Sequence, residues 1–187
     1  RNANDGISYA QVADSALSGV NDAVGRINEL SLQAANGALT DTDRSAIQDE
    51  ITQLQEQVGE TFENTTFGGK QIFDGNDVAF QVGADANIVS SANAGDNSVL
   101  AAIQAIDVTT QAGAQAAITT TQQVQEDVNS NRASLGAFEN GLRSTINGLA
   151  NQEENVAAAR SRIADTDFAQ TVSEKIAADI RSQASTA

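Results

Sequence analysis

Two pairs of acidic side chains stand at a spacing that could bind a cation. Asp41 and Asp43 form one pair, and Asp165 and Asp167 form the other. Ca²⁺ takes about six to eight oxygen ligands, and the EF-hand loop that supplies them has a glycine at a fixed position, which neither pair provides. Both pairs fit the start of a helix, where carboxylates face the positive end of the helix dipole. We therefore predict that they support helices and that the chain has no metal site.

The sequence lacks several residue types on which active sites depend. Its 187 residues include no Cys, His, Met, Trp or Pro. Without His or Cys there is no zinc site of the usual ligand types, no thiol nucleophile, no imidazole base and no disulfide. We predict that the protein is not an enzyme and holds no cofactor.

The chain is strongly acidic, with 25 Asp and Glu against 10 Lys and Arg. Nucleic acids and anionic membranes bind clusters of basic residues, so neither is an expected partner. No apolar run approaches the roughly 18 residues of a membrane span, and no signal-peptide pattern opens the chain. Residues 1–109 hold 16 of the acidic and 4 of the basic side chains. This acidic half is either a solvated surface or one complementary in charge to other copies of the molecule.

Small and apolar residues recur at alternating intervals of three and four in the first part of the chain. This heptad spacing predicts a helix over residues 6–36. We expect Asn4 or Asp5 to cap its start and Asn36-Gly37 to end it with a left-handed turn. The apolar seam consists of Ala10, Ala13, Leu17, Val20, Val24, Ile27, Ser31 and Ala34.

A second helix is predicted to begin after a capping box. Thr40 is placed to accept a hydrogen bond from a first-turn amide, and Asp43 lies at the positive end of the helix dipole. The helix should stop before Phe67-Gly68-Gly69. Because few residues separate the two helices, we expect them to run antiparallel. Its seam is Ile47, Ile51, Leu54, Val58 and Phe62.

The residues after the second helix change to a β-prone type. Two short runs, 70–73 and 78–82, flank the turn-forming sequence Asp74-Gly75-Asn76-Asp77 and predict a β-hairpin. The next segment is rich in small polar residues. It predicts a loop with one more short strand near Ile88-Val89, followed by a short helix over residues 98–106.

The longest pattern begins near Thr110 and predicts a helix with a seam of about 40 residues, which at 1.5 Å per residue spans roughly 60 Å. Such a length predicts an elongated molecule. Polar residues within a seam weaken it but can fix the register of the partner helices. After Asp165-Thr166-Asp167 the apolar spacing changes to every fourth residue, which indicates a separate segment. The seam is Val124, Val128, Asn131, Leu135, Phe138, Leu142, Thr145, Leu149, Gln152, Val156, Ala159 and Ile163.

Several stretches of this sequence, taken in order, resemble those of one protein family. They are residues 1–8 (RNANDGIS), 28–37 (NELSLQAANG), 47–51 (IQDEI), 80–83 (FQVG) and 154–169 (ENVAAARSRIADTDFA). Together they span nearly the whole chain, and they are similar to bacterial flagellin.

The resemblance implies a mainly α fold, an elongated antiparallel helical bundle or coiled coil with a small β-hairpin. Residues 1–166 would form the core domain of the filament's outer tube (D1-like), with the β-hairpin region at about residues 70–95. Residues 167–187 would be part of the C-terminal inner-tube helix (D0-like). Flagellins ordinarily begin earlier and end later, so we expect both true termini to lie outside this sequence.

The resemblance also implies a function. The protein would be a structural subunit of the bacterial flagellar filament, self-assembling through helical-bundle contacts to form the propeller for swimming. It would be extracellular, exported by the flagellar secretion route without a cleaved signal peptide. Its partners would be other flagellin subunits, an export chaperone and the filament cap. The alternative is a hook-filament junction protein or another secreted coiled-coil interaction protein.

Two sets of candidate interaction residues follow from the resemblance. Arg26, Leu30 and Glu50 match positions through which flagellins contact a host flagellin-sensing Toll-like receptor. Arg26 and Leu30 lie on one helix face and either present an exposed contact or pack within the molecule. The second set would pair with the family's N-terminal segment during assembly, so we expect this chain not to polymerise by itself. That set is Phe168, Val172, Ile176 and Ile180.

Overall fold

The computed structural model describes residues 1–83, 89–95 and 97–186, and it is mainly α-helical. The predicted fold class, a helical bundle with a small antiparallel β element, is confirmed. The chain divides into two compact units, Arg1–Arg143 and Ser144–Ala187. The predicted division between residues 166 and 167 stays a prediction. The elements are α1 (Asn2–Ala34), α2 (Asp41–Asn64), β1 (Thr66–Phe67), β2 (Lys70–Gln71), β3 (Val78–Gln81), β4 (Val89–Ala92), α3 (Ser98–Gln104) and α4 (Gln111–Thr186).

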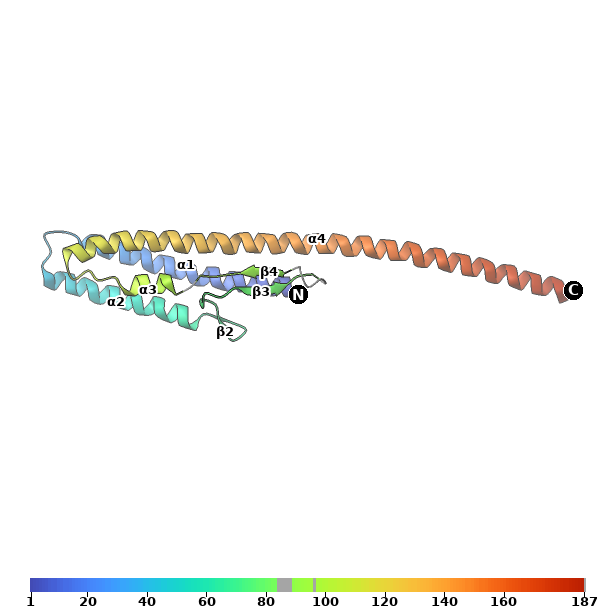
Figure 1. The fold of residues 1–187 in the computed structure, drawn as a ribbon, viewed down its shortest axis with the longest axis horizontal. Helices are drawn as coiled ribbons and strands as arrows, with labels where there is room; N and C mark the ends of the chain where they lie inside the picture. Colours follow the sequence, from blue (N-terminus) through green and yellow to red (C-terminus); the bar gives the residue numbers. More distant parts are fainter. Residues whose placement is uncertain (84–88, 96, 187) are drawn as a thin grey trace. The chain divides into compact units, whose positions relative to one another are not determined.

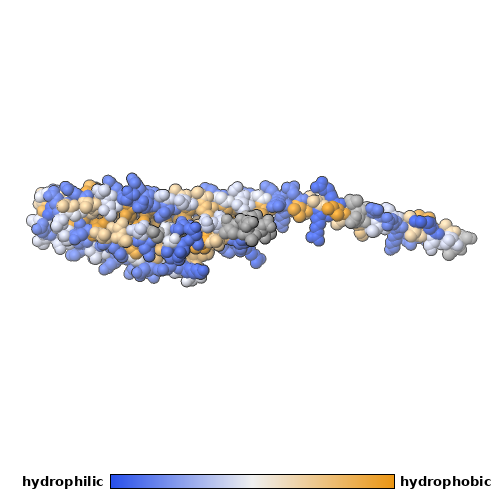
Figure 2. All heavy atoms as spheres, in the orientation of Figure 1, coloured by the Kyte–Doolittle hydropathy of each residue, from blue (hydrophilic) through white to orange (hydrophobic). Residues whose placement is uncertain are grey.

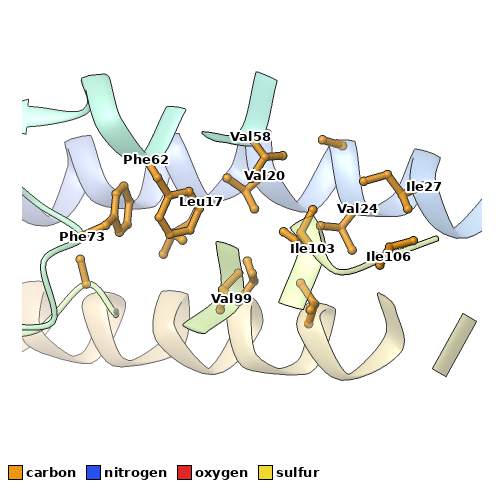
Figure 3. Close-up of a cluster of buried hydrophobic side chains, with 14 of the residues drawn as sticks. Leu17, Val20, Val24, Ile27, Val58, Phe62, Phe73, Val99, Ile103 and Ile106 are labelled. Carbon is orange, nitrogen blue, oxygen red and sulfur yellow. The ribbon is translucent and has the colours of Figure 1, made fainter. Parts of the chain in front are cut away.

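The first unit is a helical bundle around one hydrophobic core. Helix α1 runs antiparallel to α2 and to the first part of α4, and the short α3 packs against α2 (Figure 1). Every seam residue predicted for the first helix is buried, as is the second seam apart from the half-buried Leu54. Figure 3 shows Leu17 and Val20 of α1 meeting Val58 and Phe62 of α2, with Val99 of α3 nearby. The narrow apolar stripes of the helices are therefore buried against one another.

Helix α1 begins earlier than predicted. It starts at Asn2 with Arg1 as its N-cap, and no side chain caps it, so the prediction that Asn4 or Asp5 would do so is wrong. The added turn is held by packing, because Ala3 and Gly6 are both buried. A side chain at Gly6 would stand 2.7 Å from a methyl carbon of Leu142, so glycine allows this close approach.

The end of α1 is also made differently from the prediction. Ala35 at the C-cap is right-handed, and neither Asn36 nor Gly37 has a positive φ, so the predicted left-handed stop is wrong. Instead, the side chain of the buried Arg44 holds the end of α1 and the following turn by donating to three backbone oxygens. Its Nε lies 2.9 Å from Ala34 O, its Nη1 2.9 Å from Leu39 O and its Nη2 3.0 Å from Asn36 O. The guanidinium thus bonds the last carbonyl of α1, which the helix end leaves without a partner, and two carbonyls of the following turn.

The capping box of α2 is confirmed. The backbone N–H of Asp43 donates to Thr40 Oγ1 at 3.2 Å, and the backbone N–H of Thr40 donates to Asp43 Oδ2 at 2.9 Å. Thr40 Oγ1 also donates to Asp43 Oδ2 at 2.7 Å, and this bond, followed by that from the Thr40 N–H, lowers the pKa of Asp43. The helix ends at Asn64, before the predicted Phe67-Gly68-Gly69 stop.

The strands pair differently from the predicted hairpin of residues 70–82. Strand β2 pairs with β1, Phe67 standing opposite Lys70, and strand β3 pairs with β4. Gly68 and Gly69 connect β1 to β2 with φ of 59° and 81°, which suits a two-residue hairpin turn. The predicted additional strand is present as β4, although Ile88 and part of the predicted 83–97 loop lie outside the described residues.

An aromatic cluster lies where the strands meet α1. The ring of Tyr9 is only 2% exposed, edge-on to Phe67 and tilted against Phe80, with centroids 5.7 Å away in both cases. Its hydroxyl has no hydrogen-bond partner among the described groups. Burial, and secondarily the charges of Asp74 and Asp77, raise the pKa of Tyr9. This cluster fixes the β element on the N-terminal part of α1.

Candidate functional site

An exposed group of charges joins α1 to α2. The guanidinium of Arg26 donates to Glu50 Oε1 from Nη2 at 2.8 Å and from Nε at 3.1 Å, and its Nη1 donates to Glu29 Oε2 at 3.1 Å. These bonds, above all that to Glu50, raise the pKa of Arg26. The side chains of Arg26 and Glu50 are 50% and 48% exposed. The pair is accessible to a partner, and exposed pairs of this kind stabilise a fold little.

Leu30 does not share this exposed surface. It is only 2% exposed and belongs to the hydrophobic core of the first unit. Of the three candidate receptor residues, the structure therefore brings Arg26 and Glu50 together at the surface and buries Leu30. This arrangement is the predicted alternative, in which the leucine packs inside and the arginine pairs with a neighbouring carboxylate.

The first part of the long seam is buried in the bundle. Val124, Val128, Leu135 and Leu142 are all buried, and Phe138 packs at the edge of the same core. Polar contacts accompany this packing. Asn28 of α1 donates from its side-chain amide to the buried Thr121 Oγ1 at 2.6 Å, and Arg132 Nε donates to Asp14 Oδ1 at 2.7 Å. These cross-helix bonds fix the register of α1 against this part of α4.

The seam continues past Arg143 with its apolar residues exposed. Leu149 is 37% exposed, whereas Val156 and Ile163 reach 61% and 67%. The unit formed by residues 144–187 contains only the end of α4, so no second element of that unit can cover them. Figure 2 shows apolar side chains at the surface along this stretch. This face is a candidate assembly surface.

The second candidate set lies further along the same helix. Phe168, Val172, Ile176 and Ile180 are all exposed, between 37% and 71%. The helix is continuous through Thr186, so the change to every-fourth spacing does not interrupt it. That spacing places the four side chains along one slowly turning stripe. The stripe and the exposed end of the seam lie on different faces of α4, because Phe168 follows Ile163 by a rotation of about 140° around the helix.

Asp41 and Asp43 stand in the first turn of α2, as predicted, whereas Asp165 and Asp167 lie within the continuous helix α4, so the prediction that the second pair opens a helix is wrong. Asp43 is bound within the capping box, and Asp41 Oδ1 lies 3.4 Å from Arg44 Nη1. The side chains of Asp165 and Asp167 lie outside the description of the structure. Across the parts of the chain that can be examined, no group of three or more acidic residues is arranged to hold a metal ion.

A groove of about 600 Å³ lies between α1 and the end of α2, lined by side chains such as Gln11, Val12 and Thr61. None of the residues lining it is titratable, so it offers no acid, base or charged ligand-binding group. In the described portion of the chain, no helix is long and apolar enough to cross a membrane.

Sequence reasoning missed the structural roles of Arg44 and of the Arg132–Asp14 pair. Arg44 could have been noticed as the only basic residue in a helix with seven acidic ones. Its burial depends on the path of the preceding turn, which the pattern does not reveal. Arg132 and Asp14 are 118 residues apart, and no local signal links them.

Comparisons with known proteins agree with this architecture. Residues 1–78 match the family model of the bacterial flagellin N-terminal helical region, and residues 118–187 match that of the C-terminal helical region. The chain is 34% identical to the flagellin of Bacillus subtilis (strain 168), with 100% of this chain and 74% of the relative covered. It is also 34% identical to the flagellin of Halalkalibacterium halodurans, covering 100% and 71%. The crystal structure of Bacillus cereus flagellin superposes with a TM-score of 0.72 at 26% identity, covering 85% of this chain and 94% of that chain. The chain belongs to the bacterial flagellin family.

Proposed function

We propose that this flagellin chain enters the filament through the exposed apolar side chains in the C-terminal part of α4. Flagellins are structural proteins, and the chain is a subunit of the bacterial flagellar filament, which lies outside the cell and is built from many flagellin subunits. The carrying observation is two sets of large apolar side chains that the C-terminal unit leaves uncovered, on different faces of the helix. One set is Leu149, Val156 and Ile163, and the other is Phe168, Val172, Ile176 and Ile180.

The physical argument rests on the cost of leaving these apolar side chains in water. A single amphipathic helix gains little stability from its own hydrogen bonds and depends on packing of its apolar side. Contiguous exposed apolar surface on a soluble protein marks an interaction site. Helices of neighbouring subunits in a filament would cover these side chains. We therefore assign Phe168, Val172, Ile176 and Ile180 to contacts that form on assembly.

Substitution on this face tests the proposal. Ile176→Asp should prevent incorporation into filaments, because a carboxylate would be buried without a partner in the assembled state. Gln170→Asp, which adds the same charge at an exposed polar position of the helix, is the matched control and should be incorporated normally. Incorporation is measured by electron microscopy of filaments from cells that carry the variant as their only flagellin. Normal filaments from Ile176→Asp would refute the assembly role.

We also propose that the chain reaches the filament by the flagellar secretion route, accompanied by an export chaperone and added beneath a filament cap. Membership of the flagellin family supports this route. Cells without a flagellar export apparatus should retain the protein inside. Its appearance in the medium of such cells would contradict this route.

For recognition by a host flagellin-sensing Toll-like receptor, we propose Arg26 and Glu50 as the direct contacts, with Leu30 acting from the core. The exposure of the first two side chains and the burial of the third support this division. Arg26→Ala should weaken binding of the monomer by at least about 1 kcal/mol if the arginine anchors the interface. Arg160→Ala, an exposed arginine of the C-terminal unit, is the control. Unchanged binding by a folded Arg26→Ala protein would exclude the anchor.

A further inference from the structure

The turn between α1 and α2 contains one of three Asn-Gly pairs in the chain. Asn36-Gly37 lies in this turn, whereas Asn140-Gly141 and Asn147-Gly148 lie inside α4. Asparagine followed by glycine is chemically labile, because the unhindered backbone nitrogen of glycine can attack the side-chain carbonyl of the asparagine. The three pairs have the same two residues, so the surrounding backbone decides which of them reacts.

The attacking nitrogen is unoccupied only in the turn. Within the described structure the N–H of Gly37 donates no hydrogen bond, and both Asn36 and Gly37 are exposed. The N–H groups of Gly141 and Gly148 lie inside an α-helix, where each donates to the carbonyl four residues earlier. Those two sites can react only after the helix opens locally.

The turn also activates the nucleophile. When the nitrogen of Gly37 loses its proton, the negative charge spreads onto the carbonyl oxygen of the same peptide group, Asn36 O. That oxygen accepts from Arg44 Nη2 at 3.0 Å and from the backbone N–H of Leu39 at 3.2 Å. A buried guanidinium and an amide already in place stabilise such a charge without reorganisation.

A separate hydrogen bond polarises the electrophile, which is the side-chain carbonyl of Asn36. The backbone N–H of Ala38 donates to Asn36 Oδ1 at 3.1 Å. Attack on the side-chain carbon places negative charge on Oδ1, and this N–H faces that charge as an oxyanion-hole donor would. One turn therefore presents an available nitrogen, a stabilised anion and a polarised carbonyl.

We propose that Asn36 is a self-modification site at which the folded protein deamidates. The Gly37 nitrogen gives its proton to solvent and forms a bond to Cγ of Asn36, and the side-chain nitrogen takes up a proton and leaves as ammonia. The resulting succinimide is opened by water. Attack of water on the former side-chain carbonyl leaves aspartate, and attack on the main-chain carbonyl leaves isoaspartate. Water is the only co-reactant, and nothing is oxidised or reduced.

Deamidation changes the charge at a sensitive place. Either product adds a negative charge beside the C-terminal end of α1, where the helix dipole disfavours it. In the isoaspartate product the main-chain carbonyl carbon of Asn36, whose oxygen accepts from Arg44 in the unmodified protein, becomes a free carboxylate. Arg44 then faces a carboxylate instead of a carbonyl, so the guanidinium offsets part of the penalty.

The test compares the three sites in one sample. The full chain is incubated in mildly alkaline buffer, and peptide mapping by mass spectrometry follows replacement of the amide at each asparagine. In the native protein Asn36 should deamidate at least about tenfold faster than Asn140 and Asn147, because the helical sites must first open. In urea the three rates should converge. Equal native rates at the three sites would overturn the proposal.

Two variants separate the attacking group from its activation. Gly37→Ala should slow deamidation of Asn36 severalfold by crowding the nitrogen, and its new methyl group meets only Gln111 Nε2, at 3.5 Å. Gly141→Ala, whose new methyl group meets nothing within 4 Å, is the control and should leave the rate of Asn36 deamidation unchanged.

Arg44→Lys tests the activation. It should lower the rate of Asn36 deamidation in the native protein but not the rate in urea. An unchanged or faster native rate in Arg44→Lys would remove Arg44 from the proposal, and an unchanged rate in Gly37→Ala would overturn it entirely.

Discussion

The two parts of α4 have the same kind of sequence and different surroundings. From Gln111 to Arg143 the large aliphatic residues of its seam are buried in the first unit, whereas Leu149, Val156 and Ile163, at the same heptad spacing, are exposed. A heptad pattern therefore indicates that one face of a helix packs against another surface. It does not indicate whether that surface belongs to the same chain or to another molecule.

The difference arises from what stands opposite each part. The first part faces α1, which has a complementary seam of small and apolar residues and a glycine where the helices approach closely. Hydrogen bonds between the helices, such as that from Arg132 to Asp14, fix the register of this contact. The C-terminal unit is one helix and contains no such opposing surface. The comparison predicts that equivalent substitutions in the two parts will have different consequences.

The largest expected effect comes from placing a charge in the buried part of the seam. Leu142→Asp should lower the free energy of unfolding by about 4 kcal/mol or more, because it removes core packing and buries an unpaired carboxylate. The same change at the exposed Ile163 should alter it by no more than about 0.5 kcal/mol. Urea denaturation followed by circular dichroism measures both. Similar losses at the two positions would mean that the comparison is wrong.

Arg44 tests whether the first unit also depends on buried polar contacts. Arg44→Met keeps much of the side-chain length but removes donors to three backbone oxygens, and it should cost about 2–4 kcal/mol of unfolding free energy. Arg160→Met, at an exposed position of the C-terminal unit, should change stability by less than about 0.5 kcal/mol. The two variants are compared by chemical denaturation. A loss below about 1 kcal/mol in Arg44→Met would show that water replaces the guanidinium readily.

The capping box should have a smaller effect that depends on pH. Thr40→Ala should cost about 1 kcal/mol at neutral pH. Because Thr40 lowers the pKa of Asp43 in the folded state, this stabilisation is present above the ordinary pKa of aspartate and is lost as the pH falls through the lowered value. The stability difference between wild type and Thr40→Ala should therefore shrink in acid. Thr42→Ala, a neighbouring exposed position, is the control, and a difference that grew in acid would contradict the assignment.

The smallest effect is expected at Arg26. Its two carboxylate partners are exposed, so Arg26→Ala should change the free energy of unfolding by less than about 0.5 kcal/mol. Thermal denaturation at low and high salt would detect any larger contribution. A larger, salt-sensitive loss of unfolding free energy would show that the Arg26–Glu50 pair stabilises the bundle, as the buried contacts do.

The helices were predictable from sequence because their periodicity is long and regular. All eight seam residues of α1 are buried as expected, and the capping box of α2 has both of its hydrogen bonds. The strand pairing was not predictable, because runs of two to four residues give little register information. Ile72 and Phe73, which were predicted to lie in a strand, are buried in the core without being part of one. Strand β3 pairs with β4, which follows it in the chain.

The candidate contact residues were predictable in position but not in exposure. Arg26 and Leu30 lie one turn apart on α1, and this spacing is compatible with a shared surface. Burial of Leu30 depends on how the neighbouring elements pack, which a single-helix pattern cannot specify. The Arg44 contacts were missed for a related reason, since they join a helix side chain to carbonyls whose positions are set by an irregular turn.

The enclosed ring of Tyr9 gives the molecule a built-in optical reporter. The chain has one Tyr and no Trp, so its tyrosine absorbance and fluorescence come from a single buried position near the strands of the first unit. Because the pKa of Tyr9 is raised, its ionisation in alkali follows exposure of the ring, and stability falls as the pH rises past the ordinary tyrosine value. A spectrophotometric titration would therefore follow the opening of that end of the bundle, while residues 144–186 contribute no tyrosine or tryptophan signal.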